Sequence, residues 1–178
     1  MNVQEETKHL VISAFLLAIA VIIQFLGKSI PQISQFLVGP TVNAILLLTV
    51  YFAGHKYGIL VGGLTPLLAF ATAVIAPAMW PFVPFIAIGN IIYVIIFALL
   101  KKIKNGNILG VVVGSIAKFL FLSYSATKLI NWIAPNMSAD VKAKLAVAMG
   151  TPQLITALAG GAAAIILYQL LKKRTGAI

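Results

Sequence analysis

Six long apolar runs alternate with short polar segments along the chain. The runs have helical length, and each is bounded by glycine, proline, asparagine or a charged residue, which are typical of helix ends. They cover residues 10–26, 36–53, 58–76, 82–100, 108–133 and 152–171. Since about 20 apolar residues suffice for a helix to cross a bilayer, the pattern predicts an all-α bundle of six membrane-spanning helices.

Two of the segments between the runs predict loops that could form the mouth of a pocket. The first, residues 27–35, is short and rich in amides, including Gln32 and Gln35. The second, residues 77–84, contains three prolines, whose fixed φ angle stiffens the chain around Trp80. Trp80 is equally well interpreted as a ligand contact or as an aromatic anchor at the membrane interface.

A further short helix is predicted between the fifth and sixth runs. Ser138 can cap a helix over residues 139–149, which Gly150 would end. Thr151 and Pro152 then suit the N-cap and the first helical position of the sixth span.

Composition makes the chain an integral membrane protein. Hydrophobic residues are 61% of the 178 residues, charged residues are 9%, and the mean hydropathy is +1.07. Six spans leave no room for a separate soluble catalytic domain, so residues 1–178 are expected to form a single membrane domain. The first run is interpreted as a span and not as a cleaved signal peptide, because its apolar stretch continues to Leu26 and two glutamates precede it.

Positive charge separates between alternating loops and predicts the orientation. Eight basic residues fall on the side of the two termini: Lys8, Lys56, Lys101, Lys102, Lys104, Lys172, Lys173 and Arg174. Three fall on the other side: Lys28, Lys142 and Lys144. The bias places both termini in the cytoplasm. The formal charge of +10 thus reflects topology, and its dispersal at helix ends argues against nucleic-acid binding.

The predicted spans lack the side chains of most enzymes. They contain no Asp, Glu or His, and the chain has no cysteine, so neither a catalytic carboxylate pair nor a thiolate metal site is available. We therefore expect no enzymatic activity, no cofactor and no metal. Relay carboxylates for ion-coupled transport are also missing, so any transport would take its energy from a partner.

Two lysines lie inside the fifth predicted span, and both need an explanation. A lysine at the centre of a membrane helix costs roughly 2.5–3.5 kcal/mol on the insertion scale. A period of 3.6 residues places Lys118, Phe121, Ser125, Lys128 and Trp132 on one stripe, with Tyr124 beside it. A basic stripe lined with aromatic rings suits an anionic organic ligand. The alternative, stronger for Lys128 than for Lys118, is that the lysine side chain reaches the outer interface.

Amides and small residues complete the candidates. Asn90 and Gln153 suit ligand binding and helix-to-helix hydrogen bonds equally, whereas Asn43 favours packing. The pairs Ala14 with Ala18 and Gly160 with Ala164 have the spacing of close helix contacts.

Taken together, these features resemble the substrate-binding (S) components of energy-coupling factor (ECF) vitamin transporters. Ala14-x-x-x-Ala18 is similar to the motif by which family members dock on a transmembrane scaffold subunit. The segment from Gly54 through Gly58 and Gly62 to Thr65-Pro66 resembles the glycine-rich turn and third helix of the family. The resemblance implies a prokaryotic plasma-membrane protein that works with the scaffold and two ATPase subunits. It also implies an outward pocket formed by the fourth to sixth helices and capped by the first and third outward loops.

Lysines without a carboxylate partner favour an acid such as pantothenate, nicotinate or lipoate over a cation such as thiamine. The candidate substrate-binding residues are Lys118, Asn90, Gln153, Trp80, Phe121, Tyr124, Ser125, Lys128, Gln32 and Gln35. A membrane scaffold of the rod-shape-determining type, which binds proteins instead of solutes, is the alternative function. A purified scaffold of that kind should carry no small molecule.

Overall fold

The computed structural model describes residues 2–28 and 31–175, except for the side chains of residues 31–35 and 175. The described chain is helical almost throughout and contains no strand. Its elements are α1 (Val3–Lys28), α2 (Pro31–Phe52), α3 (His55–Ala71), the 3₁₀ helix η1 (Pro77–Phe82), α4 (Val83–Leu100), α5 (Gly106–Tyr124), the π-helical turn η2 (Ser125–Leu129), α6 (Ile130–Ile133), α7 (Ala139–Ala148) and α8 (Thr151–Thr175). The predicted all-α fold is confirmed.

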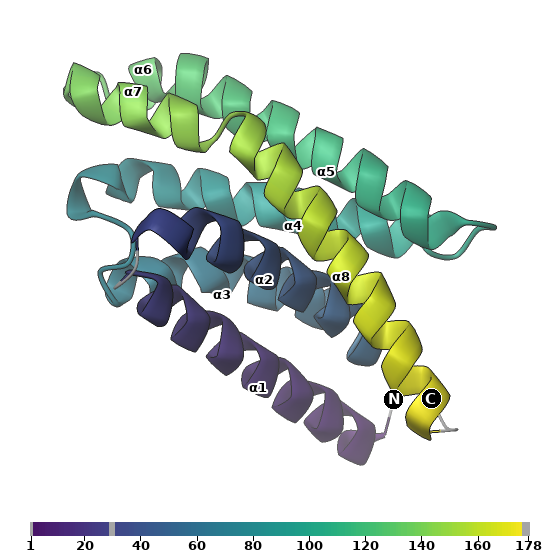
Figure 1. The fold of residues 1–178 in the computed structure, drawn as a ribbon. Helices are drawn as coiled ribbons and strands as arrows, with labels where there is room; N and C mark the ends of the chain where they lie inside the picture. Colours follow the sequence, from purple (N-terminus) through teal and green to yellow (C-terminus); the bar gives the residue numbers. More distant parts are fainter. Residues whose placement is uncertain (1, 29–30, 176–178) are drawn as a thin grey trace.

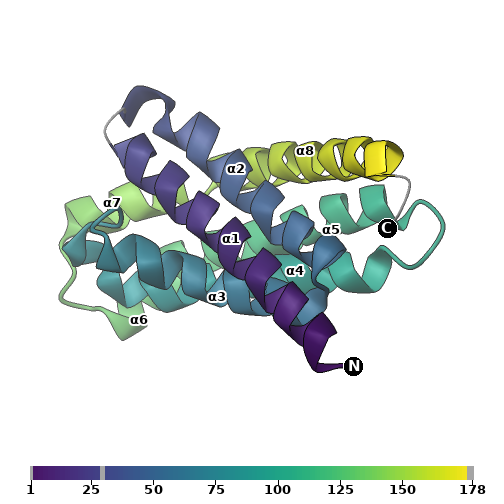
Figure 2. The ribbon, with the colours of Figure 1, turned by 90° about the horizontal axis from the view of Figure 1, so that it is seen from below.

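These elements form one bundle of six long helical segments, in which η1 continues into α4, and α5 continues through η2 into α6. Four segments are long and apolar enough to cross a membrane: Val3–Lys28, Pro77–Leu100, Gly106–Ile133 and Ala139–Arg174. A shorter apolar helix covers Phe36–Phe52. Helices α1 and α5 lie on opposite sides of the bundle, and both ends of the chain lie at the same end of it (Figures 1 and 2).

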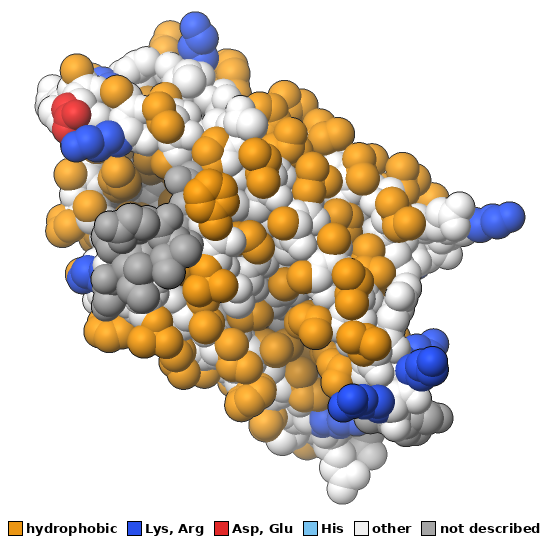
Figure 3. Space-filling view, viewed as in Figure 1, with side chains coloured by type: hydrophobic (Ala, Val, Ile, Leu, Met, Phe, Trp, Pro, Cys, Tyr) orange, Lys and Arg blue, Asp and Glu red, His pale blue; other side chains and the backbone are white. Residues whose placement is uncertain are grey.

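The surface between the two ends of the bundle is apolar, and the lysine and arginine side chains gather at the ends (Figure 3). Large hydrophobic side chains such as Phe15, Leu99 and Leu120 are more than half exposed. A soluble protein rarely exposes apolar surface this extensively, whereas a lipid-facing surface requires it. The chain is therefore a multi-pass membrane protein.

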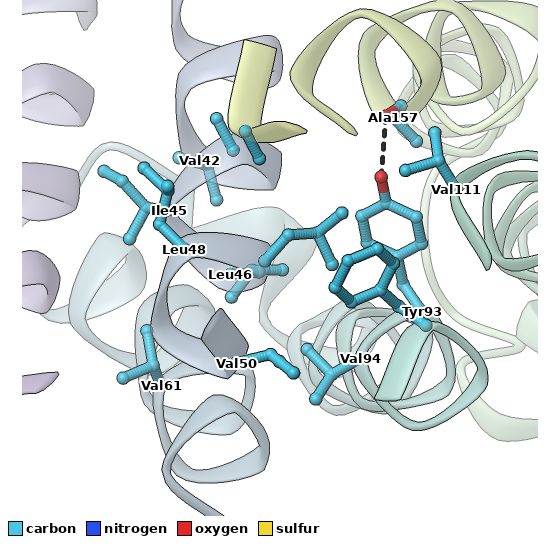
Figure 4. Close-up of a cluster of buried hydrophobic side chains, with 14 of the residues drawn as sticks. Val42, Ile45, Leu46, Leu48, Val50, Val61, Tyr93, Val94, Val111 and Ala157 are labelled. Atoms are coloured by element: carbon cyan, nitrogen blue, oxygen red, sulfur yellow. Dashed lines mark hydrogen bonds between the residues drawn. The ribbon is translucent and has the colours of Figure 1, made fainter. Parts of the chain in front are cut away.

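The core lies where α2, α4 and α8 meet. Leu46 and Phe97 are fully buried there, and the Tyr93 hydroxyl donates a hydrogen bond of 2.8 Å to the Ala157 carbonyl (Figure 4). Gly160 lets α8 approach α2 closely, since a Cβ atom at this position would lie only 2.4 Å from the Pro40 carbonyl oxygen. The predicted small-residue contact on the last helix is thus present.

Several predicted boundaries are wrong. The predicted loop over residues 27–35 is largely helical, because α1 continues to Lys28 and α2 begins at Pro31. The third run continues to residue 76 in hydropathy, yet α3 ends at Ala71. Its end is closed by a turn in which Ala73 has a left-handed φ of 54° and Val74 N–H donates to the Ala69 carbonyl.

The predicted short helix is present as α7. The Ser138 side chain accepts a hydrogen bond from Val141 N–H, and the helix ends at Ala148. Thr151 is the first residue of α8 and not its cap, a difference of one position.

The predicted stripe along the fifth span is not formed. The π-helical turn η2 lies between Lys118 and Trp132 and changes the angular position of every residue beyond Tyr124. Lys118 is 3% exposed, whereas Trp132 is 88% exposed. The side chain of Lys128 is likewise exposed, as an interfacial lysine would be.

Candidate functional site

The centre of the site is the buried ammonium group of Lys118, which joins three helices. Its Nζ donates hydrogen bonds to Asn43 Oδ1 on α2, at 2.7 Å, and to Asn90 Oδ1 on α4, at 2.8 Å. Lys118, Asn43 and Asn90 are each at most 3% exposed. Lysine carries only donors, so two carboxamide oxygens are well-matched partners.

Each asparagine is held by a second hydrogen bond, which fixes the direction of its oxygen. Asn43 Nδ2 donates to the Gly39 carbonyl at 2.9 Å, and Asn90 Nδ2 donates to the Gly62 carbonyl at 3.2 Å. With both nitrogens occupied, both oxygens point toward Lys118. The lysine is therefore positioned by helix backbones through two rigid side chains.

An aromatic ring supports the same group. Lys118 Nζ lies 5.7 Å from the centroid of the Tyr93 ring, within the range of a cation–π contact. The Tyr93 hydroxyl is bound to Ala157 on α8, which holds the ring in place. Helix α8 thus also contributes to the position of the lysine.

No acidic side chain balances Lys118. The three acids of the chain are Glu5 and Glu6, in the first turn of α1, and Asp140, which is exposed and pairs with Lys144 at 2.8 Å. A lysine has three N–H donors, of which two are used here. In its charged form, Lys118 would offer a third donor and its charge to a ligand.

Lys118 faces a cavity of about 150 Å³ near the end of the bundle opposite the chain termini. All six long helical segments contribute to its wall. The lining residues are Gln24, Val38, Gly39, Val42, Asn43, Thr65, Pro66, Ala69, Val74, Ile75, Ile86, Asn90, Lys118 and Gln153. The first three helices supply most of these residues. This differs from the pocket that the resemblance implies, which the fourth to sixth helices would form.

Gln24 is a polar residue of the cavity that the sequence interpretation missed. It is 8% exposed, and its Oε1 accepts no hydrogen bond in the part of the chain that the structure describes. The other cavity amides are engaged: besides the asparagines, Gln153 Nε2 donates to the Ala148 carbonyl at 3.4 Å. The signal for Gln24 was an amide side chain within a first span whose other residues are apolar except for Ser13.

The structure brings together only part of the predicted site. Lys118, Asn90 and Gln153 share the cavity. Four other candidates do not line it: Trp80, Tyr124 and Lys128 are exposed, and Phe121 packs in a second apolar cluster against Phe85. Ser125 is buried away from the cavity, and its hydroxyl has no hydrogen-bond partner among the described residues. The side chains of Gln32 and Gln35 are not among those that the structure describes.

A second, larger hollow of about 740 Å³ lies around η1 and α7. Trp80, Phe85, Pro135 and Met137 are among its lining residues, and none of the described residues that line it is charged. The Lys118 cavity is therefore the better match to an anionic ligand.

Ala14 and Ala18 lie on the outside of the bundle. Both are exposed, on a face of α1 that also presents Val11 and Phe15. Small side chains on an exposed membrane helix leave room for close approach by a helix of another protein.

The comparison with known families agrees with this picture. Residues 8–171 match the family model described as ECF transporter, substrate-specific component. No curated protein and no solved structure matches the chain.

Proposed function

The chain belongs to the family of ECF-transporter substrate-specific components, and from this premise we propose that it binds a water-soluble vitamin or related micronutrient for import. The membrane fold and the family make it a transporter subunit with a small-molecule substrate. We further propose that the substrate is a carboxylate, such as pantothenate, nicotinate or lipoate. The observation that carries this proposal is that Lys118 is buried, faces the cavity and has no acidic side chain as a partner.

The cavity has the mixture of groups that a small-molecule site requires. Apolar side chains such as Val42, Ala69 and Ile86 form most of its wall, and a few polar groups converge on the interior. A carboxylate at Lys118 would accept the free N–H donor and supply the missing negative charge. Asn90 would then act by holding Lys118 in position, and Gln153 would contact the ligand.

Transport itself requires partners. We propose that a transmembrane scaffold subunit and two ATPase subunits supply the energy, and that the scaffold docks against Ala14 and Ala18. Both alanine side chains are exposed on the outside of the bundle, which contact with another subunit requires. In this arrangement both termini lie in the cytoplasm of a prokaryotic cell, and the Lys118 cavity faces outward.

Mass spectrometry of the purified, denatured protein tests the proposed function. The expected result is a co-purifying carboxylate in stoichiometric amount, or tight binding of one from a panel of vitamin acids. A scaffold of the rod-shape-determining type would carry no small molecule. The proposal would be overturned if no carboxylate co-purified with the protein and none from the panel bound to it.

A further inference from the structure

The size of the Lys118 cavity limits what it can hold. An apolar cavity of about 150 Å³ accommodates a benzene-sized molecule, and the cavity here has that volume. A ligand that adds a carboxylate and one further polar atom to such a body has about ten non-hydrogen atoms. Pantothenate and lipoate are larger than this, so part of either molecule would lie outside the cavity.

The polar groups of the cavity differ in what they leave unused. Asn43 and Asn90 spend their oxygens on Lys118 and their nitrogens on backbone carbonyls, and Thr65 donates to the Val61 carbonyl at 2.6 Å. Gln24 differs, because its buried Oε1 has no partner among the described residues. An unpartnered buried polar atom destabilises the folded protein, and a ligand hydrogen bond would offset that cost.

Gln24 and Lys118 reach the cavity from helices on opposite sides of the bundle, α1 and α5 (Figure 1). A ligand between them therefore meets a cationic donor on one side and a neutral carboxamide on the other. The unpartnered atom, Gln24 Oε1, is an acceptor, so a ligand hydroxyl or amine N–H can satisfy it, whereas an unprotonated ring nitrogen cannot.

We propose that the substrate is a monocarboxylate about the size of one aromatic ring, bound through its carboxylate by Lys118 and recognised at a second polar group by Gln24. This inference rests on the proposed function and adds to it the size class of the substrate and the residue that selects its uncharged end. Gln24 is then a specificity-determining residue, whereas Lys118 binds the feature common to all acids.

Three ring acids of matched shape test this division. Benzoate has no second polar group, nicotinate replaces one ring C–H by nitrogen, and 3-hydroxybenzoate adds a hydroxyl at the same ring position. Titration calorimetry on the purified protein should show that 3-hydroxybenzoate, which can donate to Gln24 Oε1, binds about threefold to tenfold more tightly than benzoate and nicotinate, the range of one neutral hydrogen bond. The Gln24→Leu variant should lose this preference and bind benzoate as before.

Two variants separate this role from a general loss of structure. Gln169→Leu removes an exposed carboxamide from α8 and should bind all three acids like the parent protein. Lys118→Met should weaken all three together.

The inference is overturned if Gln24→Leu weakens benzoate as much as 3-hydroxybenzoate, or if the parent protein prefers pantothenate or lipoate to every ring acid. A co-purified carboxylate much larger than ten non-hydrogen atoms would overturn the size class and leave the proposed function standing. The absence of any carboxylate ligand would instead reject the proposed function itself.

Discussion

Lys118 Nζ lies 2.7 Å from Asn43 Oδ1, a contact that joins α5 to α2 in the interior of the bundle. The same asparagine oxygen therefore serves helix packing and the position of the ammonium group. Because the amide is neutral, it satisfies a donor without cancelling the charge. A ligand that enters the cavity finds the lysine already oriented and still in need of an anion.

Replacing Lys118 with methionine should weaken substrate binding. The change keeps most of the side-chain volume but removes the ammonium, so a carboxylate loses a charge-assisted contact of about 1.5–3 kcal/mol. This loss corresponds to a rise in dissociation constant of roughly tenfold to hundredfold. Titration of the co-purified substrate, or of the best ligand from the panel, measures it.

Lys128→Met provides the matched control, because Lys128 is exposed and lies outside the cavity. The affinity of the Lys128→Met variant for the substrate should equal that of the parent protein. If the Lys118→Met variant binds the same substrate undiminished, the lysine is structural and the case for an anionic ligand fails.

An aspartate in place of Asn43 should also impair binding, for the opposite reason. The new carboxylate would stand next to Lys118 Nζ and provide the counter-charge that the ligand would otherwise bring. We expect a dissociation constant for carboxylates at least about tenfold higher, and the thermal unfolding temperature checks the fold, because aspartate cannot donate to the Gly39 carbonyl as Asn43 Nδ2 does. Calorimetry and thermal unfolding in detergent measure the two quantities. Undiminished affinity in Asn43→Asp would show that the ligand does not respond to the charge at Lys118.

The sequence predicted the fold well, because lipid imposes a simple requirement on the chain. Each span must be apolar over helical length, and the runs ending at residues 100 and 133 coincide with the ends of α4 and α6. Helix ends that are set by hydrogen-bonded turns were harder to predict from the sequence. The end of α3 at Ala71 depends on an alanine in a left-handed conformation, which no glycine at residue 73 marks in advance.

The site was only partly predictable. Lys118 and Asn90 were identified because polar groups in apolar spans are costly and need a reason. The aromatic partners were misplaced because a period of 3.6 residues was extended through residues 125–129, where the helix makes a π turn. Gln24 was missed because an amide near the end of a span also suits the membrane interface.

Gly160 should tolerate no side chain. A Cβ atom there would lie 2.4 Å from the Pro40 carbonyl oxygen and 2.7 Å from Asn43 Cβ, so Gly160→Ala must push α8 away from α2. Overpacking of this kind costs about 1–3 kcal/mol. We expect a lower unfolding temperature in detergent. Gly63→Ala is the control, since its Cβ would meet only Ile91 Cδ1, at 3.9 Å, and it should unfold like the parent.

The orientation in the membrane can be read with single cysteines, because the chain has none of its own. Asn2 and Lys102 are exposed at the end that carries most of the basic residues, and Asn136 is exposed at the other end. An impermeant maleimide applied to intact cells should label a cysteine at position 136 and spare cysteines at positions 2 and 102. The reverse pattern would mean that the positive-inside interpretation is wrong for this chain.

Ala14 and Ala18 offer a test of coupling that is independent of the binding site. Replacing both with leucine adds bulk to an exposed face of α1, so it should prevent close approach by a scaffold helix without disturbing the core. In cells that contain the ATPase and scaffold subunits, uptake of the substrate should fall to background. Binding to the purified variant should remain within about twofold of the parent, a difference of less than 0.5 kcal/mol.

Leucine at Val11, on the same exposed face, is the control and should leave uptake intact. Normal uptake by the double variant would place docking elsewhere on the protein, and a parallel loss of binding would show that the substitutions damage the fold.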